Sequence, residues 1–332
     1  MPEVRVDPLT GLKVIVAGER ASRPGGGPTT TAPDPIDVAT DPFADGHEDR
    51  TPPELFAVRD TDPPTPADTP GWKVRVVPNL YPALDDASPE PAPFANRDLF
   101  TAAAARGAHE VIVNAPDPVT SLADLARDQV VTAVEVWRER MRAHADHAAY
   151  VHLIVNERRE AGASLPHTHA QLYALDFVPA AVARERERFG AHATRTMGGN
   201  LLGDLVQEEV RLRDRIVAID DEAVLMAPFA SRLPFQLMLA PRTPRDRFED
   251  ADPTHPTGAA LLHEGLQRLA RVLGHSPPLN LWVRTAPRGA ERFCWRIDVL
   301  PRLTHMAGLE LGTGVHLNVV APEHAAAQLR DA

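Results

Sequence analysis

The chain has 332 residues, of which 43% are hydrophobic and 24% are charged, as in soluble globular proteins with one large or two smaller domains. A formal net charge of −11 and the lack of a basic cluster argue against a nucleic-acid partner. The single cysteine, Cys294, excludes an intrachain disulfide framework and a zinc site built from several cysteines.

The sequence also argues against membrane insertion and secretion. No apolar run approaches the roughly 18 residues that a membrane-spanning helix needs. The first residues, M-P-E-V-R-V-D, lack the apolar core of a signal peptide. We therefore expect a cytoplasmic protein with no membrane partner.

In the first half of the chain, the sequence predicts short strands, one long helix and loops rich in Pro, Gly, Thr and Asp. Residues 72–77 alternate and residues 110–113 are a short apolar run, so both are predicted to be strands. A helix is predicted to begin near Ser121, and a further strand covers residues 149–155. The helix is marked by apolar residues at helical spacing, namely Val130, Val134, Trp137 and Met141. The predicted loops are 22–35, 60–71 and 85–96.

The second half repeats this succession. Two charged segments, 184–195 and 201–215, are predicted to be helical, and a strand pair is predicted around the turn at 230–234. The strands of that pair are 225–226 and 235–239, the next helix carries Leu262, Leu266, Leu269 and Leu273, and the last strands are 281–284 and 293–299.

The order strand, strand, long helix, strand, strand therefore occurs twice along the chain. This order predicts an α+β fold of two repeats, each an antiparallel sheet with packed helices. The N-terminal half is predicted to span residues 1–176 and the C-terminal half residues 177–332.

The segment S-L-P-H-T-H-A-Q-L-Y, residues 164–173, places His167, His169 and Gln171 at alternate positions. In an extended strand, alternate side chains point to the same face, so all three are expected to share one space. Three interpretations follow. The residues form a polar strand face, or the histidines bind a metal as in cupin-type barrels, or one imidazole attacks phosphorus and is transiently modified. A cupin would carry a glutamate soon after the second histidine, but the next carboxylate is Asp176.

The flanking residues favour the nucleophile. The segment N-E-R-R-E-A-G-A-S-L-P-H-T-H-A-Q, residues 156–171, resembles the active-site segment of galactose-1-phosphate uridylyltransferases, a branch of the histidine-triad superfamily. Similar matches occur in family order over most of the chain, at residues 7–11, 19–24, 46–54, 76–84, 109–113 and 300–314. The resemblance implies two histidine-triad-like repeats.

The resemblance also implies roles for single residues. His169 would be the nucleophile that becomes nucleotidylated, and Gln171 would bind the transferred phosphoryl group in place of the third histidine of triad hydrolases. His167, the first histidine of the motif, is counted with them as a catalytic residue. The substrate-binding residues implied are Arg20 and Arg23 (nucleotide), Asn79 (base or ribose), Asn156 (nucleotide pocket), Ser164 (phosphate oxygen) and Glu310 (sugar hydroxyls).

The chain departs from the family at both of its metal sites. Many members carry C-P-F-C where this chain reads Asp41-Pro42-Phe43-Ala44. The resemblance implies four zinc-ligand positions, at residues 41, 44, 118 and 167. Asp41, Ala44 and Pro118 stand at three of them, so His167 is the one ligand retained. Either Asp41, Asp45, His47 and His167 replace the site, or Asp41 accepts a hydrogen bond from His167 and holds the loop without metal. The H-W-H segment of the second, often iron, site reads Cys294-Trp295-Arg296. The sequence therefore implies no definite cofactor. Zinc is kept as an alternative, although most of its usual ligands are absent.

The function implied is a ping-pong nucleotidyltransferase of carbohydrate and galactose metabolism. It would move a nucleoside monophosphate from a nucleotide sugar of the UDP-glucose type to a hexose 1-phosphate. Two alternatives remain: an ADP-sugar or dinucleoside polyphosphate phosphorylase with the same histidine intermediate, and an inactive nucleotide-binding module. No residue separates uracil from adenine. The expected partners are a nucleotide sugar, a sugar phosphate and a second copy of the chain, with active sites near the subunit boundary.

Overall fold

The computed structural model describes residues 1–22, 27, 29–92, 99–251 and 257–332. Its main feature is a ten-stranded sheet with the order β3-β4-β5-β7-β6-β11-β12-β10-β9-β8, in which neighbouring strands are antiparallel. The strands are β3 Phe56–Val58, β4 Val74–Pro78, β5 Gly107–Val113, β6 Tyr150–Glu157, β7 His169–Leu175, β8 Ile216–Ile219, β9 Ala223–Met226, β10 Leu237–Pro241, β11 Leu279–Arg284 and β12 Arg296–Pro301.

The two halves of the sheet have the same connectivity, which confirms the predicted α+β fold of antiparallel sheets with packed helices. The first five strands are ordered 3-4-5-7-6 and the second five 8-9-10-12-11. The halves are joined into one sheet because β6 pairs with β11, from Glu157 opposite Leu279 to Ile154 opposite Trp282. The chain passes from one half to the other between β7 and α2 (Ala180–Thr196), and the boundary at residue 176 stays a prediction.

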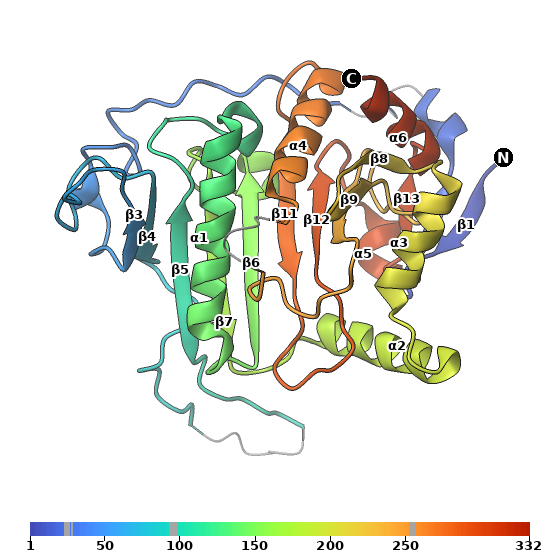
Figure 1. Cartoon of the computed structure of the whole chain (residues 1–332), viewed down its shortest axis with the longest axis horizontal. Coiled ribbons are helices and arrows are strands. Elements are labelled where there is room, and N and C mark those ends of the chain that lie inside the picture. The colour runs from blue at the N-terminus through green and yellow to red at the C-terminus, as the bar shows by residue number, and fades with distance from the viewer. Residues whose placement is uncertain (23–26, 28, 93–98, 252–256) are drawn as a thin grey trace.

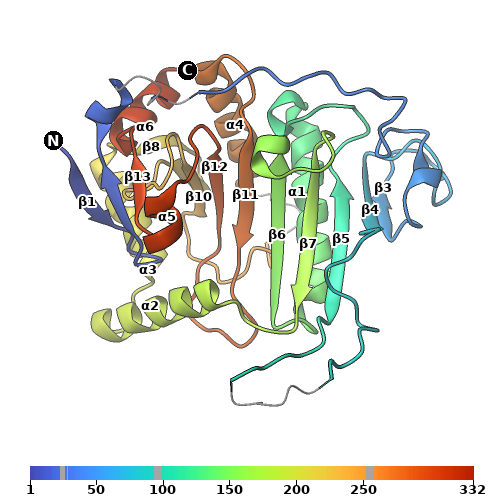
Figure 2. The ribbon, with the colours of Figure 1, turned by 180° about the vertical axis from the view of Figure 1, so that it is seen from behind.

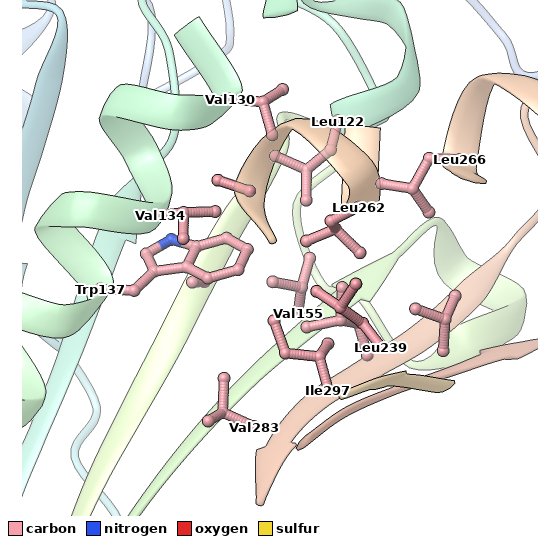
Figure 3. Packing of buried hydrophobic residues seen from close by; sticks show 14 of the residues in the cluster. Leu122, Val130, Val134, Trp137, Val155, Leu239, Leu262, Leu266, Val283 and Ile297 are labelled. Atoms are coloured by element: carbon pink, nitrogen blue, oxygen red, sulfur yellow. The ribbon is translucent and has the colours of Figure 1, made fainter. Parts of the chain in front are cut away.

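Two helices cover one face of this sheet (Figure 1). Helix α1 (Arg127–Ala145) lies over the first half and α4 (Ala259–Leu273) over the second. Each presents an apolar stripe to the strands, and burying one large aliphatic side chain contributes about 1.5–3 kcal/mol. The predicted positions Val130, Val134, Trp137, Met141, Leu262, Leu266 and Leu269 are buried, whereas Leu273 is only partly buried. Figure 3 shows Val134 and Trp137 with Leu262 and Leu266 over Val155, Leu239, Val283 and Ile297.

The predicted helix start near Ser121 is displaced by one short element. Ser121 caps the 3-10 helix η3 (Leu122–Asp124), where its side chain accepts a hydrogen bond from the Ala123 N–H. Helix α1 begins after this turn, at Arg127. The remaining helices are η1 Gly18–Ser22, η2 Glu48–Arg50, η4 Arg159–Ala161, α3 Leu201–Leu212, α5 Gly308–Thr313 and α6 Pro322–Asp331. Within the described ranges, none of the helices is both long and apolar enough to cross a membrane.

The N-terminal segment lies with the C-terminal half of the chain. Strands β1 (Glu3–Val6) and β2 (Lys13–Val16) form a hairpin, and β2 pairs in parallel with β13 (His316–Asn318) in a second, three-stranded sheet. Both termini therefore lie at the same end of the molecule (Figure 1). This pairing also places η1, with Arg20, beside the C-terminal half.

Strand β7 turns alternate side chains to opposite faces of the large sheet. Ala170, Leu172 and Ala174 are buried in the core beneath α1. The strand period of two places His169 and Gln171 on the other face. Neither α1 nor α4 covers that face, which Figure 2 shows from behind.

Candidate active site

A cavity of about 340 Å³ opens on the face of β7 that is turned away from α1, within the size range of small-molecule sites, roughly 300–1,000 Å³. Its walls come from the 42–52 loop, the end of β4, the 164–165 loop and β7. The residues with polar or charged groups that line it are Arg50, Thr51, Asn79, Tyr81, Ser164, His169 and Gln171. His169, Gln171, Asn79 and Ser164 thus come together as the sequence predicted.

The imidazole of His169 is held in one tautomer. Its Nδ1 lies 2.7 Å from the backbone oxygen of His167, and because a carbonyl oxygen only accepts, Nδ1 carries the proton. Burial lowers the pKa of His169, which favours the neutral ring. The lone pair is then on Nε2, and the hydrogen bond that the His169 side chain makes among the described residues uses Nδ1 instead. The ring of Phe43 packs against it at 5.2 Å between centroids. Such an imidazole is prepared to act as a nucleophile.

His167 does not share the cavity, which corrects the expectation that alternate positions place all three motif residues in one space. Strand β7 begins only at His169, so the strand period does not extend to His167. Its side chain is buried, with Nδ1 2.6 Å from Asp41 Oδ2 and Nε2 2.8 Å from the Ala115 backbone oxygen. Both partners accept, so the ring satisfies both contacts as an imidazolium. His167 therefore supports the loop before His169 rather than facing the cavity.

His167 and Asp41 form the hydrogen bond that one of the two predicted replacements for the zinc site requires. Burial alone would raise the pKa of Asp41, but the hydrogen bonds from His167 and from the Phe43 N–H outweigh it and lower this pKa. The carboxylate is thus ionised beside a cationic ring. The pair joins the 41–44 segment to the motif loop.

The alternative zinc set does not fit the structure. His47 points its Nδ1 at the backbone oxygen of Asp41, at 2.7 Å, and Asp45 accepts a hydrogen bond from the Gly71 N–H. Ala44 and Pro118, at two family ligand positions, carry no donor side chain. A structural zinc needs four ligands in a tetrahedron. Among the residues that the structure places, no group of three or more His, Cys, Asp or Glu is arranged to hold a metal ion.

At the family's second metal site, which reads Cys294-Trp295-Arg296 in this chain, an arginine stands in place of a histidine. Arg296 is buried, and its guanidinium donates to Glu185 Oε2 at 2.9 Å and to Asp298 Oδ2 at 3.0 Å. A fixed cation therefore lies between two buried carboxylates. Burial raises the pKa of Cys294 to about 12, so its thiol stays protonated and is a poor metal ligand.

The remaining substrate-binding predictions fall in different places. Asn156 lies one position beyond the last β6–β7 pair and accepts a hydrogen bond from Asn280 Nδ2 at 2.8 Å. It is therefore next to His169 by register but does not line its cavity. Arg20 and Glu310 line a second cavity of about 530 Å³ near β13. Arg23 lies outside the described residues.

Several residues at the site were not predicted from the sequence. Phe43 and Arg50 line the cavity, and both belong to segments already compared with the family. His109 and Tyr173 lie behind Gln171 and contact its amide oxygen at 3.1 and 3.0 Å. Tyr173 follows Gln171 by two positions, so the strand period could have placed it on the same face. His109 is 62 residues away, and its contact depends on the pairing of β5 with β7.

A buried carboxyl beneath the motif loop predicts a pH-dependent stability. Glu157 is 1% exposed and accepts hydrogen bonds from Ser121 Oγ at 2.6 Å and from the Leu122 N–H at 2.7 Å. Burial nevertheless raises the pKa of Glu157 from 4.5 to about 7. The folded state then prefers the neutral acid. The stability from this group is present below the unfolded pKa and is lost as the pH rises through about 7.

We expect Glu157→Gln, which cannot ionise, to remove this part of the pH dependence. At about 1.4 kcal/mol per pKa unit, the wild type should lose up to roughly 3 kcal/mol more than the variant between pH 4.5 and 8. Denaturant unfolding of both proteins across this range measures the difference. Parallel curves of unfolding free energy against pH would contradict the assignment.

Comparisons with known proteins identify the family of the chain. The family described as "Galactose-1-phosphate uridyl transferase, N-terminal domain" matches residues 1–179, and a "Domain of unknown function (DUF4921)" matches residues 103–332. An ADP-glucose phosphorylase of Arabidopsis thaliana is 29% identical over 99% of this chain and 93% of its own length. A probable galactose-1-phosphate uridylyltransferase of Drosophila melanogaster is 26% identical over 99% of this chain and 95% of its own.

The fold comparison points the same way. The crystal structure of an ADP-glucose phosphorylase from Arabidopsis thaliana with bound ADP-glucose superimposes with a TM-score of 0.81 and 28% identity, covering 100% of this chain and 99% of that one. The family match covers more than half of the chain, and the likeness in sequence and fold spans nearly all of it. The chain belongs to the galactose-1-phosphate uridylyltransferase family of nucleotidyltransferases.

Proposed function

We propose that the protein transfers a nucleoside monophosphate from a nucleotide sugar to a phosphate acceptor through a covalent nucleotidyl-His169. One observation carries the proposal. His169 donates its Nδ1 proton to a backbone oxygen and keeps the lone pair on Nε2, in a cavity that Gln171 and Ser164 also line. A buried neutral imidazole beside potential hydrogen-bond donors is the arrangement that phosphorus chemistry with a histidine nucleophile requires.

The first half-reaction forms the intermediate. Nε2 of His169 attacks the α-phosphorus, the new P–N bond forms, and the P–O bond to the β-phosphate breaks. The sugar 1-phosphate leaves with the electron pair of that bond. Positive charge develops on the ring, and the His167 backbone oxygen that accepts from Nδ1–H stabilises it. Hydrogen bonds from the Gln171 amide and the Ser164 hydroxyl would stabilise the charge on the transferred phosphoryl oxygens.

The second half-reaction reverses the chemistry with a different acceptor. An oxygen of the acceptor phosphate attacks the same phosphorus, the P–N bond breaks, and its electron pair returns to Nε2. Inorganic phosphate as acceptor gives a nucleoside diphosphate, whereas a hexose 1-phosphate gives a new nucleotide sugar. His169 is regenerated at the end. Transfer to inorganic phosphate and transfer to a hexose 1-phosphate would therefore use the same residues.

The comparisons favour ADP-glucose with inorganic phosphate as the pair to test first. The Arabidopsis relative named ADP-glucose phosphorylase matches nearly the whole chain at 29% identity, and the solved structure with bound ADP-glucose has the same fold. UDP-glucose with a hexose 1-phosphate, the pair first expected from the sequence, remains the second candidate. The Drosophila relative named as a probable uridylyltransferase supports it at 26% identity.

A second copy of the chain would unite the predicted substrate residues. Arg20 and Glu310 line one cavity and His169 another, so the two sets are separate within one chain. A homodimer that apposes the Arg20 cavity of one copy to the His169 cavity of the other would bring both to one substrate. Sedimentation analysis of an active protein as a monomer at assay concentration would contradict this arrangement.

The decisive assay follows the nucleotide on the protein. Wild type is incubated with ADP-glucose or UDP-glucose labelled at the α-phosphate, without acceptor, and the denatured protein is counted. We expect an acid-labile, base-stable label, which a chase with inorganic phosphate or a hexose 1-phosphate releases according to the true acceptor. Absence of label from every nucleotide sugar, with binding retained, would leave only a nucleotide-binding module.

A further inference from the structure

The amide oxygen of Gln171 is occupied from behind the cavity. It lies 3.1 Å from His109 Nε2 and accepts a hydrogen bond from the Tyr173 hydroxyl at 3.0 Å. A carbonyl oxygen has two lone pairs, so these two contacts use its full capacity. Among the described residues, both hydrogen bonds of the Gln171 side chain are made by this oxygen and neither by the amide nitrogen. It is the donor that Gln171 can offer to a ligand in the cavity it lines with His169.

The proton on His109 decides which end of the Gln171 amide faces it. Nδ1 of His109 lies 3.1 Å from the backbone nitrogen of Ala83. A backbone N–H only donates, so Nδ1 must accept and carries no proton. Burial lowers the pKa of His109, which favours the neutral ring, and the ring proton is then on Nε2. His109 therefore donates toward Gln171, and only the amide oxygen can receive that bond.

Among the described groups around His109 Nε2, the Gln171 oxygen is the acceptor in this position. Asn79 Nδ2 approaches His109 Nε2 at 3.2 Å, but both atoms carry hydrogens in this tautomer, and the Asn79 oxygen accepts from the Tyr81 N–H. The ring of Tyr173 stacks on His109 at 4.1 Å between centroids. The stacking holds the two donors side by side against the Gln171 oxygen.

Turning the Gln171 amide by 180° would exchange its oxygen and nitrogen with almost no change of shape. The nitrogen would then face the His109 N–H, which is a contact between two donors. The oxygen would face the transferred phosphoryl group, which is a contact between two acceptors. Gln171 therefore acts as a donor to phosphate only while His109 and Tyr173 hold its oxygen.

We propose that His109 is a positioning residue that orients the Gln171 amide nitrogen toward the transferred phosphoryl group. The inference rests on the proposed reaction at His169. His109 would touch neither the substrate nor the nucleophile, and it would act only through Gln171. This dependence is what a double-mutant cycle measures.

The test compares His109→Phe, Gln171→Leu and the double variant in single-turnover labelling of His169 by ADP-glucose. Losing one transition-state donor at Gln171 should slow labelling about 100-fold. His109→Phe, which lets the amide turn, should slow it on the order of 10-fold with a smaller change in nucleotide-sugar affinity. The double variant should be no slower than Gln171→Leu, because the residue through which His109 acts is already gone.

Two matched variants complete the design. His109→Gln can accept from the Ala83 N–H and donate to Gln171, so its labelling rate should stay within about 3-fold of the wild type. Tyr173→Phe leaves the His109 donor in place and should have a smaller effect than His109→Phe. The melting temperature of each variant reports whether it is folded. If His109→Phe does not fold, the labelling rates of His109→Gln and Tyr173→Phe still test the inference.

The outcomes separate the inference from the proposed function. Effects of His109→Phe and Gln171→Leu that multiply in the double variant would overturn it, as would a His109→Gln variant as slow as Gln171→Leu. Either result leaves the nucleotidyl-His169 reaction intact. If the wild type takes no label from ADP-glucose or UDP-glucose, the proposed function itself fails, and the inference fails with it.

Discussion

Replacing His169 with alanine is expected to reduce nucleotide transfer by at least about four orders of magnitude, the scale on which loss of a covalent nucleophile acts. Among the described residues that line the cavity, His169 is the only histidine. His167, two positions earlier, has both ring nitrogens committed to Asp41 and Ala115. Single-turnover labelling and steady-state release of sugar 1-phosphate measure the effect.

The control for this substitution is a histidine far from the cavity. His324 is exposed on α6, so His324→Ala should label at the wild-type rate. The His169→Ala protein should keep its melting temperature within a few degrees, because a single truncation beside a cavity removes few packed atoms. Transfer by His169→Ala at a rate near that of the wild type would show that the nucleophile is another residue.

Removing the carboxylate of Asp41 is expected to destabilise the fold by about 3–5 kcal/mol, the usual cost of leaving one partner of a buried ion pair alone. In Asp41→Ala the His167 ring loses its acceptor at Nδ1, and the Phe43 N–H loses its acceptor as well. The loop that carries His169 would then lose its support. We expect a lower midpoint in denaturant unfolding and slower nucleotide transfer.

Asp41→Asn is the matched variant. The amide can accept from the Phe43 N–H and donate to Nδ1 of a neutral His167, which still donates to the Ala115 oxygen. Its loss of stability should therefore be well below that of Asp41→Ala. Equal losses in the two variants would contradict the described hydrogen bonds, and stoichiometric zinc in the purified protein would refute support of the loop by the Asp41–His167 pair without metal.

The same pair predicts how the protein responds to acid. The pKa of Asp41 is lowered in the fold, so its contribution to stability is present above the unfolded pKa of 3.8 and is lost as the pH falls through the folded value. Asp41→Asn has no carboxylate to protonate and should lose less stability on acidification than the wild type. Unfolding free energies measured from pH 6 to pH 3 compare them.

Local periodicity explains what could be predicted from the sequence. The spacing of Val130, Val134, Trp137 and Met141 identified α1, because one face of a helix repeats every three or four residues. Because side chains alternate between the two faces of a strand, the sequence also placed His169 and Gln171 on one side of β7. Both patterns are contained within one element and need no knowledge of its neighbours.

Long-range pairing explains most of what could not be predicted. The contact of His109 with Gln171 joins residues 62 positions apart, and nothing local shows that β7 begins after His167. The join of β6 to β11 and the pairing of β2 with β13 depend on the packing of whole elements. The second pairing is why Arg20 lies near Glu310 and away from His169.

The most direct test of the central claim locates the nucleotide on the intermediate. Wild type is incubated with ADP-glucose without acceptor, digested under alkaline conditions, and fragmented by mass spectrometry to separate His167 from His169. We predict a burst of glucose 1-phosphate close to one per active chain, with one adenylyl group on His169. An adenylyl group on any other residue, or turnover with phosphate and no modified chain, would contradict the account.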